Sequence, residues 1–249
     1  LAAVTLISQS AGFAALLVWL AATGFRLDGR ALELGLLAGL GGGAGLALFY
    51  RALAVGTMSI VSPVTACGAL VPFVLALARG ERPSAIALAG AVVALGGAVL
   101  ASAEEHRSND LARRRGALLA LGAAVALGLF VYFLGLGGSQ GHTLSALVGA
   151  RIGSLAVLAG WATATRAPVR VDRAALPAIA LLGLLDTTAN GLFVLASARG
   201  LLAIVSVLGS LYPVATVLAA HLLLGETISR TQRAGVVLAL AGVAVVASG

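Results

Sequence analysis

The sequence has no lysine and few charged residues of any kind, which excludes a water-soluble fold. Only 10% of its 249 residues are charged and 60% are hydrophobic, whereas soluble domains carry about a quarter charged residues. The 16 strongly basic residues are all arginine. Without a lysine the chain lacks the Gly-x-x-x-x-Gly-Lys-Ser/Thr loop that cradles phosphates, so ATP-driven pumping by this subunit is excluded.

Residues that commonly carry catalysis or bind metals are also scarce. The single Cys67 excludes internal disulfides and cysteine metal clusters, and we expect it to pack as a small hydrophobe. His106, His142 and His221 are scattered without His-x-x-x-His spacing. Asp186 is the one carboxylate well inside an apolar run, whereas an intramembrane aspartyl protease needs two. We therefore predict no catalytic site, no metal and no cofactor.

The excess of positive charge points to a membrane surface. The formal net charge is +7, and most of the arginines lie between the apolar runs or at their ends. Arginine at those places anchors a protein to anionic lipid headgroups. We therefore expect the lipid bilayer as a partner and no nucleic acid.

Long apolar runs follow one another along almost the whole chain. Each has about 20 residues, enough for a helix to cross a hydrocarbon layer of roughly 30 Å. Residues 85–103 and 234–247 are apolar on every face, unlike the alternating strands of a membrane barrel. The prediction is an all-α integral membrane protein. Its nine predicted transmembrane helices are residues 2–23, 31–53, 57–78, 84–102, 116–136, 143–165, 174–198, 201–224 and 231–248.

The sequence repeats itself at an offset of 144 residues. The turn Arg26-Leu27-Asp28 matches Arg170-Val171-Asp172, and the matches continue through glycine, phenylalanine and serine positions up to Ser62 and Ser206. We predict a first repeat at 1–103, a linker at 104–115 and a second repeat at 116–249. Helix 116–136 has no partner in the first repeat, so we expect a native bundle of ten helices whose first helix precedes Leu1. Five helices per repeat would make the two halves inverted, as in secondary transporters.

A Gly-Glu pair ends the penultimate helix of each repeat, and a glycine-rich last helix follows. The pairs are Gly80-Glu81, before 89–97, and Gly225-Glu226, before 234–242 and after Pro213. This pattern resembles the EamA family of the drug/metabolite transporter superfamily. The resemblance implies a multi-pass exporter or importer of amino acids, other metabolites or drugs, with a central cavity between two five-helix halves.

Asp186 leads the candidate solute site. A charged side chain in lipid costs about 2.5 to 3.5 kcal/mol by insertion scales, so an intramembrane carboxylate indicates function. Thr187 follows it, and Asn190 lies one turn further along the same helical face. The equivalent first-half residues, 41–46, are mostly glycine and suit close packing. The alternative is that Asp186 and Asn190 only hold neighbouring helices together.

Arg151 is the second charge inside an apolar run. It could pair with Asp186 or with a solute carboxylate, or its side chain could extend to the membrane interface. When Trp19 is aligned with Trp161, Gln9 falls at the Arg151 position and is a polar counterpart. Both residues belong to the predicted substrate-binding set.

Further candidates lie on the remaining helices. Ser210, Tyr212 and Tyr132 are predicted to line the cavity, although an aromatic residue in a membrane helix also serves packing or interface anchoring. Pro63, Pro72 and Pro213 free backbone carbonyls and can kink helices. Pro63 and Pro213 are the candidates for helix kinks or gating, the alternative being ordinary bends.

Together these patterns predict a secondary transporter. It would move a small metabolite, an amino acid or related solute or a drug, by alternating access through the cell membrane of a bacterium. We expect an exporter, with protons as a candidate coupling ion because Asp186 could carry one. The arginine distribution places the central linker in the cytoplasm, whereas the resemblance implies the reverse orientation. The alternative function is a non-transporting structural or assembly subunit of a membrane complex.

Overall fold

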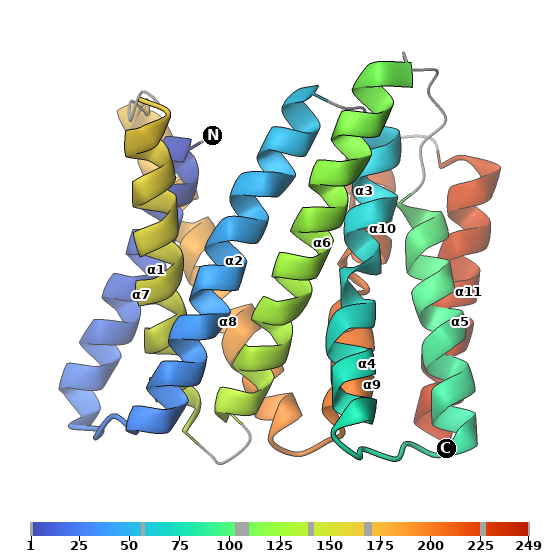
Figure 1. Cartoon of the computed structure of the whole chain (residues 1–249), viewed down its shortest axis with the longest axis horizontal. Helices are drawn as coiled ribbons and strands as arrows, with labels where there is room; N and C mark the ends of the chain where they lie inside the picture. Colours follow the sequence, from blue (N-terminus) through green and yellow to red (C-terminus); the bar gives the residue numbers. More distant parts are fainter. Residues whose placement is uncertain are drawn as a thin grey trace. The chain divides into compact units, whose positions relative to one another are not determined.

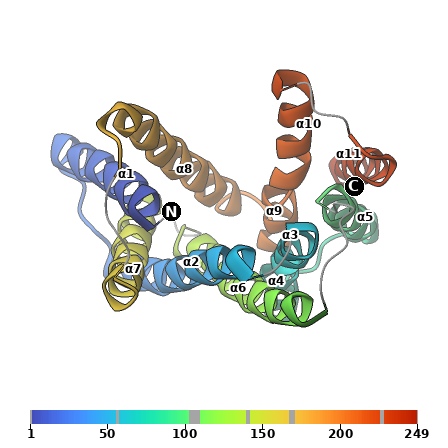
Figure 2. The same cartoon turned by 90° about the horizontal axis from the view of Figure 1, so that it is seen from above.

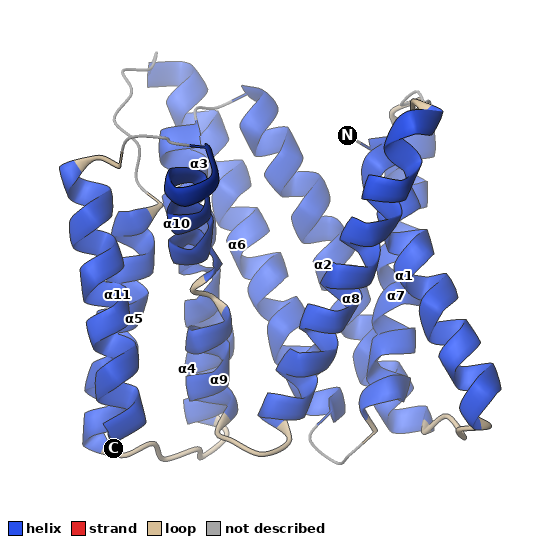
Figure 3. Ribbon diagram, turned by 180° about the vertical axis from the view of Figure 1, so that it is seen from behind, coloured by secondary structure: helices blue, strands red, loops and turns tan. Residues whose placement is uncertain are grey.

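A computed structural model describes residues 2–55, 58–102, 110–138, 142–166, 171–224 and 228–248. Throughout these residues the regular structure is helical, without a strand (Figure 3). The predicted all-α fold is confirmed. The elements are α1 (Ala2–Thr23), α2 (Gly29–Val55), α3 (Met58–Ala66), η1 (Cys67–Ala69), α4 (Leu70–Ala78), α5 (Ala85–Ala101), α6 (Asp110–Gly138), α7 (Thr143–Ala164), η2 (Arg173–Ala175), α8 (Leu176–Ser197), α9 (Leu202–Gly209), α10 (Tyr212–Leu224) and α11 (Arg230–Ser248).

The chain is a multi-pass membrane protein. In the described ranges, 8 helical segments are long and apolar enough to cross a membrane. A further apolar helix, α5, has 17 residues, which is at the lower limit for a membrane span. The nine predicted spans therefore correspond to these eight segments and α5. Helix α6 begins at Asp110, inside the segment predicted as a linker, while residues 103–109 lie outside the described part of the chain.

Two predicted spans are broken in the middle. Residues 58–78 form α3, the short 3-10 turn η1 and α4, and residues 202–224 form α9 and α10 separated at Ser210 and Leu211. A proline ring clashes with the carbonyl four residues earlier. For Pro72 that carbonyl belongs to Gly68 inside η1, and for Pro213 it belongs to Gly209, the last residue of α9. The sequence predicted both Pro63 and Pro72 as kink positions in this span, and Pro63 lies inside α3, which continues to Ala66.

The helices form two compact units, and each unit combines segments from both halves of the sequence. The first unit contains Leu1–Ala47 and Leu129–Gly200, and the second contains Leu48–Gly128 and Leu201–Gly249. Helices α2 and α6 contribute to both. The contact-based units are therefore a different division from the two predicted sequence repeats.

In the first unit, α1 packs against both α7 and α8 (Figure 2). Gly183 of α8 lies so close to α1 that a Cβ there would overlap the carbonyl of Ser8. Gly39 of α2 lies equally close to the carbonyl of Ala150 in α7. Small residues at these positions allow the helix backbones to approach closely, as is common in membrane bundles.

The two contacts are equivalent in the sequence repeat. Gly39 matches Gly183 at the offset of 144, and Ser8 matches Ala150 when Trp19 is aligned with Trp161. Helix α2 therefore meets α7 through the same pair of positions through which α8 meets α1. Two positions matched by the repeat thus make similar contacts, while the division into two repeats stays a prediction.

The second unit is built around the tight pair of α5 and α11, which lie side by side in Figures 1 and 2. Glycines from both helices line the contact. A Cβ on Gly97 would overlap the backbone of Ala239, and one on Gly242 would overlap the backbone of Ala94. Helix α4 packs on α9 in the same unit.

Glu81 fixes the start of α9 from a distant part of the chain. Its Oε1 and Oε2 accept hydrogen bonds from the backbone N–H groups of Leu202 and Ala203, at 3.1 and 2.9 Å. A carboxylate at a helix N-terminus satisfies free N–H groups and interacts favourably with the helix dipole. Glu81 thus caps a helix that lies far from it in the sequence. Gly225-Glu226, its predicted counterpart, lies outside the described residues.

Candidate functional site

Three helices of the first unit bring polar side chains together inside the bundle. Gln9, Arg151 and Asp186 each lie near the middle of a helix of 22 residues, on α1, α7 and α8. For helices that cross a membrane, the middle residues lie at the depth of the hydrocarbon core. The polar residues therefore meet where polar groups are most expensive.

Arg151 is the centre of this network. Its Nη1 atom lies 2.8 Å from Asp186 Oδ2 and also donates to Gln9 Oε1. Its Nη2 atom donates to Thr187 Oγ1 at 2.8 Å. Gln9 Nε2 donates to Asp186 Oδ2 at 3.3 Å and closes the arrangement. The guanidinium is therefore neutralised by a carboxylate and hydrogen-bonded by two neutral side chains.

Close packing of α1 on α8 positions this network. Gly12 of α1 faces Thr187, and a Cβ at that glycine would overlap the threonine hydroxyl. The same hydroxyl donates to the Gly183 carbonyl one turn earlier, at 2.7 Å. Thr187 is thereby held with its oxygen toward Arg151, because the hydroxyl proton is used within α8 and the oxygen remains free to accept.

The ion pair is unevenly buried. The Arg151 side chain is 5% exposed, whereas the Asp186 side chain is 46% exposed. Leaving a half-exposed carboxylate in contact with lipid costs several kcal/mol, about 2.5 to 3.5 on insertion scales. Contact with water removes that cost. The arrangement therefore favours a water-accessible surface beside Asp186, with Arg151 behind it.

Ser154 belongs to the network and was not predicted. Its Oγ lies 3.2 Å from Gln9 Oε1 and 3.2 Å from the Arg151 carbonyl, and the residue is 6% exposed. The signal was its position three residues after Arg151, which puts both on one face of α7. A serine in a membrane helix usually bonds within its own helix, so this spacing alone did not single it out.

The second half of the chain matches a family model. The model of the EamA-like transporter family covers residues 114–248, more than half of the chain. The chain belongs to the EamA-like transporter family. It is thus a multi-pass membrane protein of a transporter family in the drug/metabolite transporter superfamily, as the sequence resemblance suggested.

The fold of this EamA-like chain is similar to that of solved structures. A crystal structure, described only as that of a protein, aligns with a TM-score of 0.79 over 98% of this chain and 85% of the other, at 19% sequence identity. At that identity the likeness concerns the fold alone. Among curated proteins, no sequence matches this chain.

Two more candidates of the EamA-like chain lie in the first unit, outside the network. Asn190 is half-buried one turn after Asp186 on α8. Tyr132 of α6 is 7% exposed, and its ring meets the edge of Phe133 with centroids 5.4 Å apart. Tyr132 is thus buried with its ring against Phe133, whereas Asn190 shares the helical face of the exposed carboxylate.

The remaining candidates lie in the second unit, and all except Pro63 are at the break between α9 and α10. Ser210 follows the last residue of α9, and its hydroxyl donates to the Val207 carbonyl at 2.7 Å. Tyr212 begins α10 and is 55% exposed, and Pro213 follows it. Pro63 lies inside α3. Their predicted roles in solute binding and gating stay predictions.

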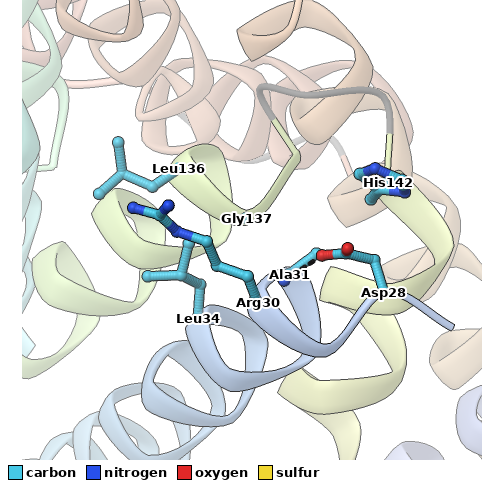
Figure 4. Close-up of a pocket in the computed structure, with 7 residues that line it drawn as sticks. All are labelled: Asp28, Arg30, Ala31, Leu34, Leu136, Gly137 and His142. Carbon is cyan, nitrogen blue, oxygen red and sulfur yellow. Dashed lines mark hydrogen bonds between the residues drawn. The ribbon is translucent and has the colours of Figure 1, made fainter.

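A small hollow lies near one end of the first unit (Figure 4). Its lining residues are Asp28, Arg30, Ala31, Leu34, Leu136, Gly137 and His142. Asp28 Oδ1 accepts from the Ala31 backbone N–H at 2.7 Å and so caps α2, while the Arg30 side chain extends toward Leu136 (Figure 4). His142 is nine residues before Arg151, about 13 Å along α7. The hollow is therefore separate from the buried network.

Metal chemistry has no visible basis in the described part of the chain. Groups of three or more His, Cys, Asp or Glu side chains that could hold an ion are not found there. The network can form ionic contacts, because the Asp186 carboxylate is exposed at its surface while the Arg151 guanidinium is buried.

Proposed function

We propose that this EamA-like protein is a secondary transporter that moves a small organic metabolite, such as an amino acid, a related solute or a drug, by alternating access. The solute binds beside the network of Gln9, Arg151, Asp186 and Thr187. The partners of the protein in this function are the solute and the lipid bilayer. Protons are a candidate coupling ion, and the direction we expect is export across the cell membrane of a bacterium.

The observation that carries this proposal is the half-exposed Asp186 carboxylate in the middle of a membrane helix. A group that only holds helices together gains most when it is buried against its partner, as Arg151 is. A carboxylate that stays exposed at that depth instead needs water or a ligand beside it. This asymmetry favours a solute site over a purely structural ion pair.

The equivalent contacts of α2 with α7 and of α8 with α1 support the mechanism. Inverted repeats place a transporter's binding site at the interface of equivalent helices near the bilayer midplane. Gln9 and Arg151 are equivalent in the repeat and hydrogen-bond to each other. Movement of the two repeats about this contact would expose the site to one side of the membrane and then to the other.

The decisive experiment is counterflow in proteoliposomes. A panel of radiolabelled amino acids and metabolites is tested with the wild type and with Asp186→Asn. We expect flux of at least one solute, reduced at least about tenfold by the substitution because one ionic hydrogen bond is worth roughly 1.5–3 kcal/mol. Asp172→Asn is the matched control, since Asp172 caps η2 at an exposed position and asparagine caps equally well.

The outcomes separate the alternatives. Flux that persists unchanged in Asp186→Asn would keep a transporter and move the site elsewhere. No flux for any solute, from protein that is folded in the vesicles, would favour a structural or assembly subunit. Flux measured in oppositely oriented vesicles gives the direction of transport.

A further inference from the structure

We propose that the Oδ1 atom of Asp186 binds a positively charged amine of the solute, so that this site selects ammonium groups over carboxylates. The inference rests on the proposed function for the place of the site, and it adds the chemical class of the ligand. It is drawn from which oxygen of Asp186 is occupied and which end of the ion pair is buried.

The two oxygens of Asp186 differ in their surroundings. Oδ2 lies 2.8 Å from Arg151 Nη1 and 3.3 Å from Gln9 Nε2. Oδ1 accepts no hydrogen bond from the residues that the structure describes, and the side chain is 46% exposed. A carboxylate can accept about four hydrogen bonds. The acceptor positions that remain therefore include those of the oxygen that the protein leaves open.

Arg151 is in the opposite situation. Both of its terminal nitrogens are engaged, Nη1 by Gln9 and Asp186 and Nη2 by Thr187. The Arg151 side chain is only 5% exposed. A carboxylate that approached it would therefore have to displace these partners. It would also meet the negative charge of Asp186 before it reached the guanidinium.

The ion pair has no net charge, but its negative member, Asp186, is exposed while its positive member, Arg151, is buried. A cation at Oδ1 stands nearer to the carboxylate than to the guanidinium, which contacts the other oxygen. Coulomb energy falls with distance, so the attraction exceeds the repulsion. An ammonium group also carries three donors, and charge-assisted N–H···O bonds are among the strongest hydrogen bonds in proteins.

Asn190 offers a second contact for the solute. It follows Asp186 by one helical turn, so the two Cβ atoms lie about 5–6 Å apart. Asn190 is half-buried and carries both a donor and an acceptor. A solute whose amine reaches Asp186 can place a polar group of the same molecule near this amide. Amino-acid-like solutes and amine drugs both satisfy this requirement.

The test is binding of matched amines and acids to the purified full chain in lipid nanodiscs. The probes are phenethylamine with 3-phenylpropionate, and 3-methylbutylamine with 4-methylpentanoate, which share a hydrocarbon skeleton and differ in the charged group. We expect an amine to bind the wild type at least about tenfold more tightly than its acid, the loss of one charge-assisted bond corresponding to about 10- to 100-fold.

Substitutions locate the effect. Asp186→Asn should weaken amine binding about 10- to 100-fold, while Asp186→Glu, which keeps the charge, should retain most of it. Asp172→Asn should change nothing. Acids binding as tightly as amines, amine binding unaffected by Asp186→Asn, or no binding of either class would each overturn the inference. If Asp186→Asn does not fold, the comparison of amine with acid in the wild type still decides.

This result is independent of transport. An amine that binds through Asp186 while counterflow is absent would support the amine site and contradict the proposed transport. Flux of acids with no preference for amines would contradict the amine site and keep transport.

Discussion

Two helix pairs of the first unit have the same packing and different chemistry. Helix α8 meets α1 through Gly183 and Ser8, and α2 meets α7 through the equivalent Gly39 and Ala150. Three and four residues after these glycines, α8 carries Asp186 and Thr187, whereas α2 carries Gly42 and Gly43. The two contacts are therefore alike, whereas the charged side chains are present in only one of the two helix pairs.

The α2 glycines have a structural reason of their own. A Cβ at Gly42 would press on the Phe130 ring, and one at Gly43 would press on Val157. A side chain at these positions would therefore collide with neighbouring helices, so α2 has no room for counterparts of Asp186 and Thr187. Glycine packing in one pair and an ion pair in the other are alternative ways to use the same place in the repeat.

The largest difference between the two helix pairs should appear when one charge of the ion pair is removed. Asp186→Ala leaves the buried Arg151 without a counter-charge, and we expect a loss of about 3–5 kcal/mol in the free energy of unfolding. Arg151→Met should cost less, because the carboxylate that remains is 46% exposed and can be hydrated. Denaturant unfolding in detergent measures both, and an equal or larger loss for Arg151→Met would contradict the uneven burial.

The next largest effect tests the two similar contacts. Gly39→Ala and Gly183→Ala each introduce a Cβ onto a backbone carbonyl, and overpacking of this kind costs about 1–3 kcal/mol. Equivalent contacts should give similar losses in unfolding experiments. Gly96→Ala on α5 is the control, because its Cβ would meet nothing within 4 Å, and no loss is expected there. Unequal losses for the first two variants would argue against the equivalence.

Gln9→Leu tests how much the Gln9 amide stabilises the contact between α1 and α7. It removes the amide that bonds Arg151 and Asp186, and a loss of about 1–2 kcal/mol is expected from the polar groups left behind. Gln9→Glu keeps an acceptor for Arg151 but places a second carboxylate beside Asp186. It should therefore make stability fall as pH rises, whereas pH-independent behaviour would show that the two side chains separate.

Much of this fold follows from the sequence because its two strongest signals are simple. Apolar runs fix where helices cross the membrane, and Asp186 and Arg151 stand out inside those runs because charges are so scarce. The interruption at Cys67–Ala69 could not be located, since its residues are as apolar as their neighbours. Pro63 and Pro72 were both predicted to be able to kink this span; the carbonyl four residues before Pro72 lies in the interruption, whereas Pro63 lies inside α3.

Contacts between distant segments were beyond the sequence for a different reason. Glu81 is next to Arg82 in the chain, yet its oxygens accept hydrogen bonds from the backbone of Leu202 and Ala203, about 120 residues away. A carboxylate chooses among partners by geometry, which only the packed bundle sets. The sequence aligned Gln9 with Arg151, but it could not predict that the two side chains hydrogen-bond to each other.

The smallest predicted effect concerns Ser154, the network member whose repeat counterpart is Gly12. Its hydroxyl bonds Gln9 and the Arg151 carbonyl, so Ser154→Ala should lower the free energy of unfolding by about 0.5–1.5 kcal/mol. Thr188→Val is the control, because that hydroxyl is exposed and bonds only the Leu184 carbonyl of its own helix. If both variants lose the same amount, Ser154 stabilises only its own helix; a larger loss for Ser154→Ala means that α7 uses a side chain to hold Gln9, where α1 has only a glycine.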